Sequence, residues 1–193
     1  AMPDQPEGSD EGILRGMYRF RASSAEDTEI RAHLFGSGAI LNEALEAQEI
    51  LADRFNIAAD VWSITSYKEL YMDGTDCDRW NRLHREIDHR TPWIQQCLDG
   101  TDGVYVAASD YVKALPESVG RWFPKAPVAL GTDGFGRSES RAELRRFFEV
   151  DAAAIVIATL EALAREGTIE RDVVHRAIAD FDIDIDAPNP IKV

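Results

Sequence analysis

Several features common in other proteins are scarce in this chain of 193 residues, and each scarcity excludes a class of protein. Its two cysteines, Cys77 and Cys97, form no Cys-x-x-Cys pair, so reduced thiols are expected. No apolar run reaches the length of a membrane span, and the N-terminus lacks the basic and apolar regions of a signal peptide. Only 21 basic residues stand against 35 acidic ones, and the net charge of −14 opposes binding to nucleic acid or anionic membranes. We therefore expect a cytoplasmic protein with neither of these partners.

The residues that are present predict one globular domain behind a short connector. Hydrophobic residues make up 45% of the chain and charged residues 29%, which is typical of a soluble protein with a real core. Residues 1–12 are rich in proline, glycine and acid, so they are interpreted as a connector or as an arm that lies on a partner. Residues 13–193 form the domain. Because position 1 is not methionine, we expect a fragment of a longer protein or an engineered start.

Strand and helix patterns alternate along this domain. Residues 13–21 are predicted to be extended, with an edge strand over 16–20. Further strands are predicted at 29–35, 60–64, 103–109 and 128–130. Helices are predicted up to residue 55, from the cap Ser66 to about Gly74, over 76–84, after the caps Asp110, Ser140 and Thr168, and over 152–164. The order predicts an α/β fold: a three-layer domain with a mainly parallel sheet and an antiparallel edge strand.

The stretch from Leu130 to Asp151 organises the rest of the chain. A short strand leads into a turn whose glycines, at positions 131, 134 and 136, adopt conformations that other residues resist. Ser140 and Glu143 then have the spacing of a capping box that begins a helix. Turns of this kind, between a strand and a helix, commonly face a ligand or a neighbouring domain.

Other patterns leave two further readings open. The sequence Gly36-Ser37-Gly38 after a strand is compatible with a nucleotide-binding or regulatory module, but Leu41 occupies the third glycine position and a tight turn is favoured. A small enzyme would use His33, His84, His89 or Cys77, but no base and orienting group accompany the cysteine. His84 and His89 have zinc-like spacing without a thiol pair, and a helix anchored by a buried Trp80 is the simpler interpretation of that segment. No catalytic, cofactor-binding or metal residue is predicted.

Three segments carry a family resemblance. Gly-Thr-Asp-Gly-Phe-Gly-Arg-Ser at 131–138, Phe-Glu-Val-Asp-Ala at 148–152 and Asp-Cys-Asp-Arg-Trp-Asn-Arg-Leu-His at 76–84 resemble the C-terminal domain of one family of enzymes. This family is the homodimeric, thiamine-diphosphate-dependent first component of bacterial pyruvate dehydrogenase complexes, which is transketolase-like. Arg85 stands where many relatives have proline, so the path of residues 85–92 is not predicted.

The resemblance implies a function for the complete enzyme. That enzyme decarboxylates pyruvate on thiamine diphosphate with magnesium and passes the acetyl group to the lipoyl group of an acetyltransferase component. The family binds the diphosphate through Gly-Asp-Gly and a later asparagine, but here Thr132 precedes Asp133-Gly134 and no asparagine follows at that distance. The implied role of this domain is therefore scaffolding, with the rest of the same chain, a homodimer partner and the acetyltransferase as partners. No cofactor is expected in the fragment, which is predicted to be inactive alone.

Five residues are candidates for contact with those partners. Asp133, Phe135 and Arg137 lie on the glycine turn, and Trp80 and His84 belong to the 76–84 segment. Arg137 is the most specific of them, because Ser140 and Glu143 already satisfy the helix start and a cation near a helix N-terminus is mildly unfavourable. We expect its guanidinium to pair with a carboxylate outside this chain.

Overall fold

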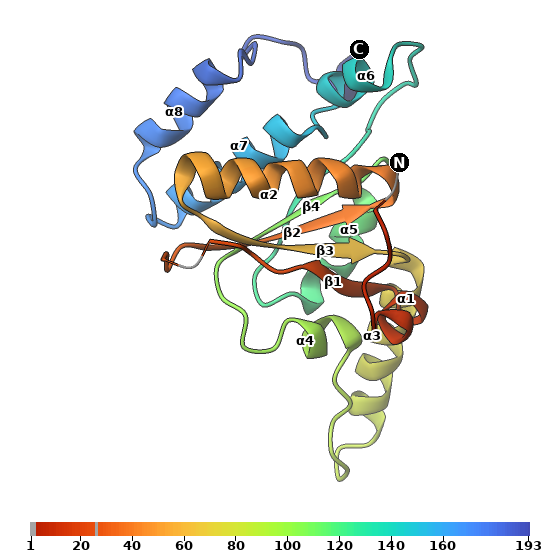
Figure 1. Cartoon of the computed structure of the whole chain (residues 1–193). Helices are drawn as coiled ribbons and strands as arrows, with labels where there is room; N and C mark the ends of the chain where they lie inside the picture. The colour runs from red at the N-terminus through yellow and green to blue at the C-terminus, as the bar shows by residue number, and fades with distance from the viewer. Residues whose placement is uncertain (1–2, 26) are drawn as a thin grey trace.

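A five-stranded sheet with helices on both faces forms the body of the protein (Figure 1). The structure, a computed structural model, describes residues 3–25 and 27–193. The strands are β1 (Met17–Arg21), β2 (Arg31–Ser37), β3 (Ala58–Ile64), β4 (Val104–Ala108) and β5 (Val128–Leu130). The α-helices are α1 (Asp10–Arg15), α2 (Leu41–Phe55), α3 (Tyr67–Leu83), α4 (Trp93–Cys97), α5 (Ala114–Val119), α6 (Arg141–Phe147), α7 (Ala152–Arg165) and α8 (Arg171–Asp180). Short 3-10 turns are η1 (Gly38–Ile40), η2 (Gly120–Trp122) and η3 (Pro190–Lys192).

The strands follow the spatial order β1-β3-β2-β4-β5. The pairs β3 with β2, β2 with β4 and β4 with β5 are parallel, whereas β1 pairs antiparallel with β3, with Met17 opposite Ile64. This arrangement confirms the predicted three-layer α/β fold with one antiparallel edge strand. The chain leaves β2 toward one edge of the sheet and leaves β4 toward the other, so the direction of winding changes between these two strands.

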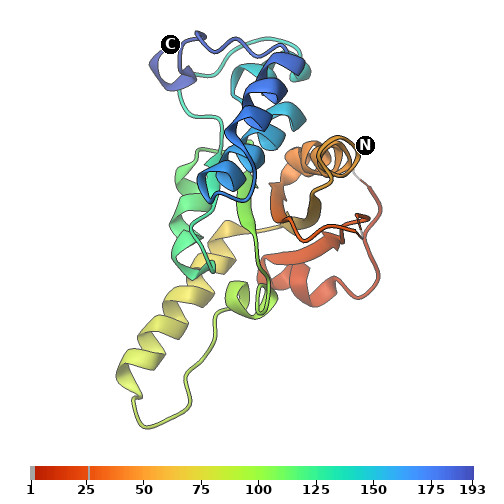
Figure 2. The ribbon, with the colours of Figure 1, turned by 90° about the vertical axis from the view of Figure 1, so that its left-hand side faces the viewer.

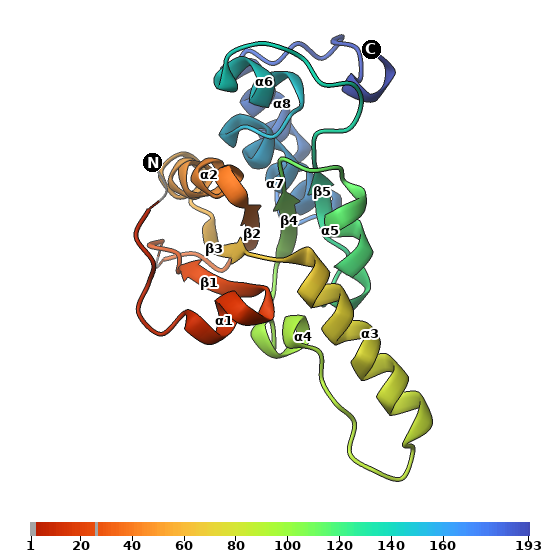
Figure 3. The ribbon, with the colours of Figure 1, turned by 90° about the vertical axis from the view of Figure 1, so that its right-hand side faces the viewer.

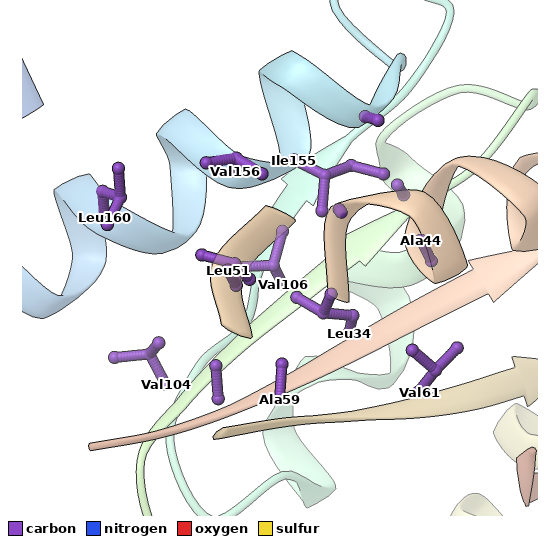
Figure 4. Close-up of a cluster of buried hydrophobic side chains, with 14 of the residues drawn as sticks. Leu34, Ala44, Leu51, Ala59, Val61, Val104, Val106, Ile155, Val156 and Leu160 are labelled. Carbon is purple, nitrogen blue, oxygen red and sulfur yellow. The ribbon is translucent and has the colours of Figure 1, made fainter. Parts of the chain in front are cut away.

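One face of the sheet is covered by α2 and α7 and is almost entirely aliphatic (Figure 4). Alternate strand residues such as Leu34, Val61 and Val106 point toward these helices, as the two-residue period of a strand requires. Leu51 of α2 and Leu160 of α7 are completely buried against them. Helix α7 is apolar on most sides, and α8 packs against it in the same core.

The opposite face is aromatic. Phe35, Trp62 and Tyr105 point from the strands toward α3, α4 and α5, and they pack with Trp122 and Phe123. The rings of Phe35 and Phe123 meet edge to face with centroids 5.0 Å apart. Each face of the sheet therefore has its own closed core, formed by side chains of this chain.

The long helix α3 corrects the prediction of two shorter helices. It begins at the predicted cap Ser66, whose hydroxyl accepts from the Glu69 N–H, but it continues through Gly74 to Leu83. Gly74 does not end a helix; it lets the Trp122 indole approach, because a Cβ there would lie 2.4 Å from the ring. The predicted burial of Trp80 is also wrong, because this side chain is only half-buried near the far end of the helix.

Two predicted helix caps are wrong. Asp110 does not cap α5, which begins at Ala114 after Lys113 without a side-chain cap. Thr168 does not begin α8; its N–H instead donates to the Leu163 carbonyl (2.9 Å) and closes the end of α7, beside Gly167 with φ of +76°. In both places the polar residue forms its contacts within a turn instead of capping the following helix.

The N-terminal segment folds onto the sheet edge. The extended segment predicted from Ile13 starts only at Met17, because Asp10–Arg15 is helical and ends at Gly16 in the left-handed conformation (φ +100°). This helix crosses the predicted boundary between connector and domain, and the first two residues of that connector lie outside the described part. Among the described residues, no helix combines the length and the apolar character needed to cross a membrane.

Candidate functional site

The loops that follow β2, β4 and β5 meet at the carboxyl edge of the sheet. At the end of β2, a Cβ on Gly36 would lie 2.6 Å from the Cα of Leu41, so this turn requires a glycine to reverse into α2. Gly38, with φ of +52°, faces the Asp110 carboxylate, whose oxygens would lie 3.4 Å from an added Cβ. This carboxylate opposes a diphosphate bound at the turn itself, against the Gly38 backbone. The turn after β2 is a tight turn, and no observation supports the nucleotide-binding alternative.

The glycine turn after β5 is fixed from its inner side by the loop after β4. The Thr132 N–H donates to the Tyr111 carbonyl (2.9 Å), and the Thr132 hydroxyl donates to the Asp110 carbonyl (2.8 Å). The Asp133 carboxylate accepts from the Lys113 N–H at 3.2 Å. Of the candidate interface residues, Asp133 thus has a partner within the chain.

The outer side of the same turn carries the other two candidates. The Phe135 side chain is 82% exposed at the apex. The Arg137 guanidinium lies 4.1 Å from the ring centroid of Phe147 on α6, a cation–π contact. Gly134, with φ of +104°, lies against the C-terminal segment, where a Cβ would meet the Pro190 carbonyl at 2.5 Å. The turn therefore presents an aromatic ring and a cation from a backbone held on both sides.

Helix α6 begins at the predicted cap. The Glu143 N–H donates to the Ser140 hydroxyl (3.3 Å), and this hydroxyl donates to the Glu143 carboxylate (3.0 Å). The pair differs from a full capping box, because the carboxylate reaches the hydroxyl rather than the backbone of Ser140. Arg137 takes no part in this cap.

Trp80 and His84, the remaining candidates, lie at the opposite end of the molecule. Helix α3 and the loop after it project away from the sheet, while the glycine turn lies beside the C-terminus at the other end (Figures 2 and 3). The His84 ring stacks on Trp80 with centroids 3.7 Å apart, and the Arg90 guanidinium lies 3.5 Å from the same ring. Two groups so close to one ring must occupy its two faces. Asn81 fixes the return of the loop through hydrogen bonds to both the N–H and the carbonyl of Arg90.

The histidine and cysteine chemistry considered from the sequence does not assemble into a site. His33 is buried, its Nδ1 accepts from the Trp62 indole (3.3 Å) and its Nε2 donates to the Asp102 carbonyl (3.0 Å). Burial lowers the pKa of His33, so a neutral imidazole with both nitrogens occupied stands there. Burial also raises the pKa of Cys77, and raises that of Cys97 to about 11, so neither thiol is an activated nucleophile.

No group of three histidine, cysteine, aspartate or glutamate residues within 3–25 and 27–193 could hold a metal ion. His84 and His89 thus have no third ligand in that part of the chain, whatever their spacing.

A cavity of about 370 Å³ opens beside the glycine turn and was not predicted. All three carboxyl-edge loops and α6 line it, including Ile40 after β2, Asp110 after β4, and Arg137 and Arg141 around the turn. One signal in the sequence could have located it. Once β2, β4 and β5 are taken as parallel, their following loops must meet at one edge, in the crevice where the winding changes.

Comparisons with known proteins agree with this architecture. Residues 16–151 match the family model of the transketolase-like TK C-terminal domain. Among solved structures, transketolase from Leishmania mexicana superposes with a TM-score of 0.56 at 19% identity, over 85% of this chain and 20% of that one. A transketolase from Pichia stipitis, in complex with sedoheptulose-7-phosphate, gives a TM-score of 0.56 at 14% identity, over 86% of this chain and 20% of that one. At such identities these structures show the fold alone.

Curated relatives are much more similar in sequence. The chain is 47% identical to the pyruvate dehydrogenase E1 component of Pseudomonas aeruginosa, and 46% identical to that of Escherichia coli K12. Each comparison covers 98% of this chain and 21% of the relative, so the chain spans about a fifth of the length of these relatives. The chain belongs to the family of transketolase-like C-terminal domains, and within it matches the C-terminal domain of bacterial pyruvate dehydrogenase E1 components.

Proposed function

We propose that this chain is the C-terminal domain of a longer pyruvate dehydrogenase E1 component and that it serves there as a scaffold. The observation that carries the proposal is identity of 46–47% to two such components across 98% of the chain, where the match takes up only a fifth of each relative. The relatives are bacterial, which favours a cytoplasmic enzyme.

The complete protein, in this proposal, decarboxylates pyruvate on thiamine diphosphate and magnesium. It then passes the acetyl group to the lipoyl group of an acetyltransferase component. This domain contributes neither the diphosphate site nor a catalytic residue, since Asp133 lies in Thr-Asp-Gly rather than Gly-Asp-Gly and its carboxylate is bonded to the Lys113 N–H. The isolated domain is inactive, and calorimetric titration with thiamine diphosphate and magnesium is expected to give no binding heat.

The domain supports the enzyme by contacts at the glycine turn. Phe135 exposes most of a large aromatic side chain at the apex, and exposed aromatic residues on a fixed backbone are typical anchors of interfaces. Arg137 lies beside it and contacts the Phe147 ring, but it forms no ion pair with any described residue, so its charge is free to pair with a carboxylate of the homodimer partner or of the preceding domains. Asp133 holds the turn in place from inside.

The end of α3 is proposed as a second contact. There the stack of His84, Trp80 and Arg90 fixes the shape of a segment that projects from the domain. A segment ordered before binding loses less conformational entropy when a partner covers it. Because the two ends lie far apart, they must meet different parts of the assembly.

A chimera tests the scaffold role. The C-terminal fifth of the Pseudomonas aeruginosa E1 component is replaced by this chain, and the truncated relative without any replacement serves as the control. The chimera is expected to sediment as a dimer and to decarboxylate pyruvate, and the truncated protein to lose both properties. If the truncated protein dimerises and turns over as well as the chimera, the domain is no scaffold and the proposal fails.

A further inference from the structure

We propose that the cavity at the carboxyl edge of the sheet is a binding site for a small organic acid. A carboxylate or phosphate group is held by Arg137 and Arg141, while its apolar part enters the cavity. The inference goes beyond the scaffold role, because it assigns a ligand to the isolated domain; in the complete enzyme this ligand would compete for Arg137 with the carboxylate proposed above.

The position of the cavity is the first support. It lies outside the carboxyl ends of β2, β4 and β5, and residues from all three following loops line it: Ile40, Asp110 and Thr132. In open α/β sheets, ligands bind in the crevice at the point where the winding changes direction, which here is between β2 and β4.

The second support is the form of the wall. Ile40, Phe148 and Val150 are 2%, 8% and 1% exposed, and together with Leu144 they give the cavity an apolar wall. The volume of about 370 Å³ falls at the lower end of the range of small-molecule sites, roughly 300–1,000 Å³. A ring or a short branched chain would fit this space.

The third support is the balance of charge. Of the three arginines on the wall, Arg145 is neutralised by Glu43, which is 13% exposed and also accepts from the Ala152 N–H. Arg137 and Arg141 form no ion pair with any residue in the part of the chain that the structure describes. Two uncompensated cations on one cavity are unusual in a protein of net charge −14, and arginine binds carboxylate and phosphate oxygens in a bidentate manner.

One acidic side chain on the cavity wall opposes this positive charge, and it predicts in which direction each substitution changes the affinity for an anion. Asp110 lines the same cavity, and its carboxylate lies beside Gly38 without a hydrogen bond to any residue within 3–25 and 27–193. Removal of this carboxylate should therefore favour an anion, whereas removal of either free arginine should disfavour it.

The experiment titrates the 193-residue chain with small probes and monitors binding by two-dimensional NMR. The isolated chain is suitable because its own helices close both faces of the sheet. Three probes separate charge from shape: benzoate has both the carboxylate and an apolar ring, acetate has only the carboxylate, and benzyl alcohol has only the ring. Benzoate is expected to bind tightest and to shift the amide signals of residues 131–145, and its affinity should fall as salt is added. Acetate also mimics an acidic side chain from another part of the enzyme, so equal affinity for acetate and benzoate would overturn the claim of a small-molecule site.

Variants make the test specific. Arg137→Gln and Arg141→Gln should each weaken benzoate binding about tenfold, the usual effect of a lost hydrogen bond to a charged group, and Asp110→Asn should strengthen it. Arg79→Gln is the matched control, because Arg79 is exposed on α3 at the other end and should leave binding unchanged. If benzoate does not bind, if all four variants bind it alike, or if benzyl alcohol binds as tightly, the proposal is wrong. The titration uses this chain alone, so its failure would leave the proposed contacts of the turn with the rest of the enzyme untouched.

Discussion

The two ends of the molecule that carry the candidate contact residues are held in different ways. The glycine turn at the carboxyl edge is fixed by segments distant in sequence, with Tyr111 and Lys113 on its inner side and Pro190 against Gly134. The end of α3 is tied to the rest of the fold at Asp78, whose carboxylate pairs with Arg121 (2.9 Å). Beyond Asp78 it is fixed by residues within 79–90, through the ring stack on Trp80 and the bonds of Asn81. The comparison shows that one surface depends on the whole fold for its shape, whereas the other is a local structure attached to it.

The largest loss of stability is expected at Gly131, where the glycine turn packs against the loop after β4. Gly131→Ala would place a Cβ 2.6 Å from the Tyr111 carbonyl oxygen and 2.8 Å from the Lys113 nitrogen, and backbone atoms cannot move aside cheaply. We expect the free energy of unfolding to fall by about 2 kcal/mol, measured by denaturant titration.

Gly136→Ala is the matched control for this change. Gly136 lies on the same turn, but the prediction that it needs a glycine conformation is wrong, because its φ is not positive and no atom stands within 4 Å of an added Cβ. This substitution should leave stability within about 0.5 kcal/mol of the parent. Equal losses at both glycines would mean that the loop after β4 does not fix the turn.

A smaller global effect is expected at the start of α6. Ser140→Ala removes the hydroxyl that accepts from the Glu143 N–H, and the free energy of unfolding should fall by about 1 kcal/mol. Ser140→Thr keeps a hydroxyl that can accept from the Glu143 N–H and donate to its carboxylate, and it should recover most of the loss. If the threonine variant is as unstable as the alanine variant, the cap does not account for the effect.

The contrast between the ends also explains which parts of the fold were predictable. Ser66 and Ser140 were located as caps because a cap and its partner lie three residues apart, within one local pattern. Asp110 and Thr168 also belong to the residue types that cap helices, but they form contacts at a turn. The local pattern therefore placed a helix start wrongly at each of them. Gly74 was taken as a helix end because nothing in the sequence shows that Trp122, 48 positions later, packs on it.

At the α3 end, a substitution should have mainly local consequences. Trp80→Ala removes the ring shared by His84 and Arg90, and amide hydrogen exchange should accelerate over residues 76–92 while β2 and β4 keep their protection. The global free energy of unfolding should fall by at most about 1 kcal/mol, since cation–π contacts at exposed sites contribute about 0.5–1 kcal/mol. Loss of protection throughout the sheet would show that this end is part of the core.

The smallest change in stability is expected for Arg137→Ala. The variant loses one cation–π contact with Phe147 and no ion pair within the described residues, so the domain should lose about 0.5 kcal/mol. Arg137→Lys keeps the cation, so its stability should lie between that of the alanine variant and that of the parent. A loss of 2 kcal/mol or more in the alanine variant, measured by thermal unfolding, would mean that Arg137 serves the domain itself.

The candidate site was only partly predictable for the same physical reason. Phe135 could be placed on an exposed turn because a glycine stands on either side of it. Arg137 could be singled out because Ser140 and Glu143 already satisfy the helix start, where a further cation is unfavourable. The cavity required Asp110 and Arg141 to be brought together by the parallel order of β2, β4 and β5, which single-sequence patterns do not specify. Asp133 was grouped with its neighbours on the turn, although its carboxylate points to the Lys113 N–H inside the chain.

Dimerisation of the chimeric E1 component with Arg137→Ala tests the central claim, that the turn is a contact surface, most directly. Sedimentation velocity over a concentration series would compare this variant with the unmodified chimera and with the Arg171→Ala variant, whose arginine is exposed on α8, outside both proposed contacts. We predict that Arg137→Ala weakens the dimer at least tenfold, as expected for an ion pair lost from an interface, while Arg171→Ala leaves it unchanged. A variant that dimerises and turns over like the unmodified chimera would contradict the account.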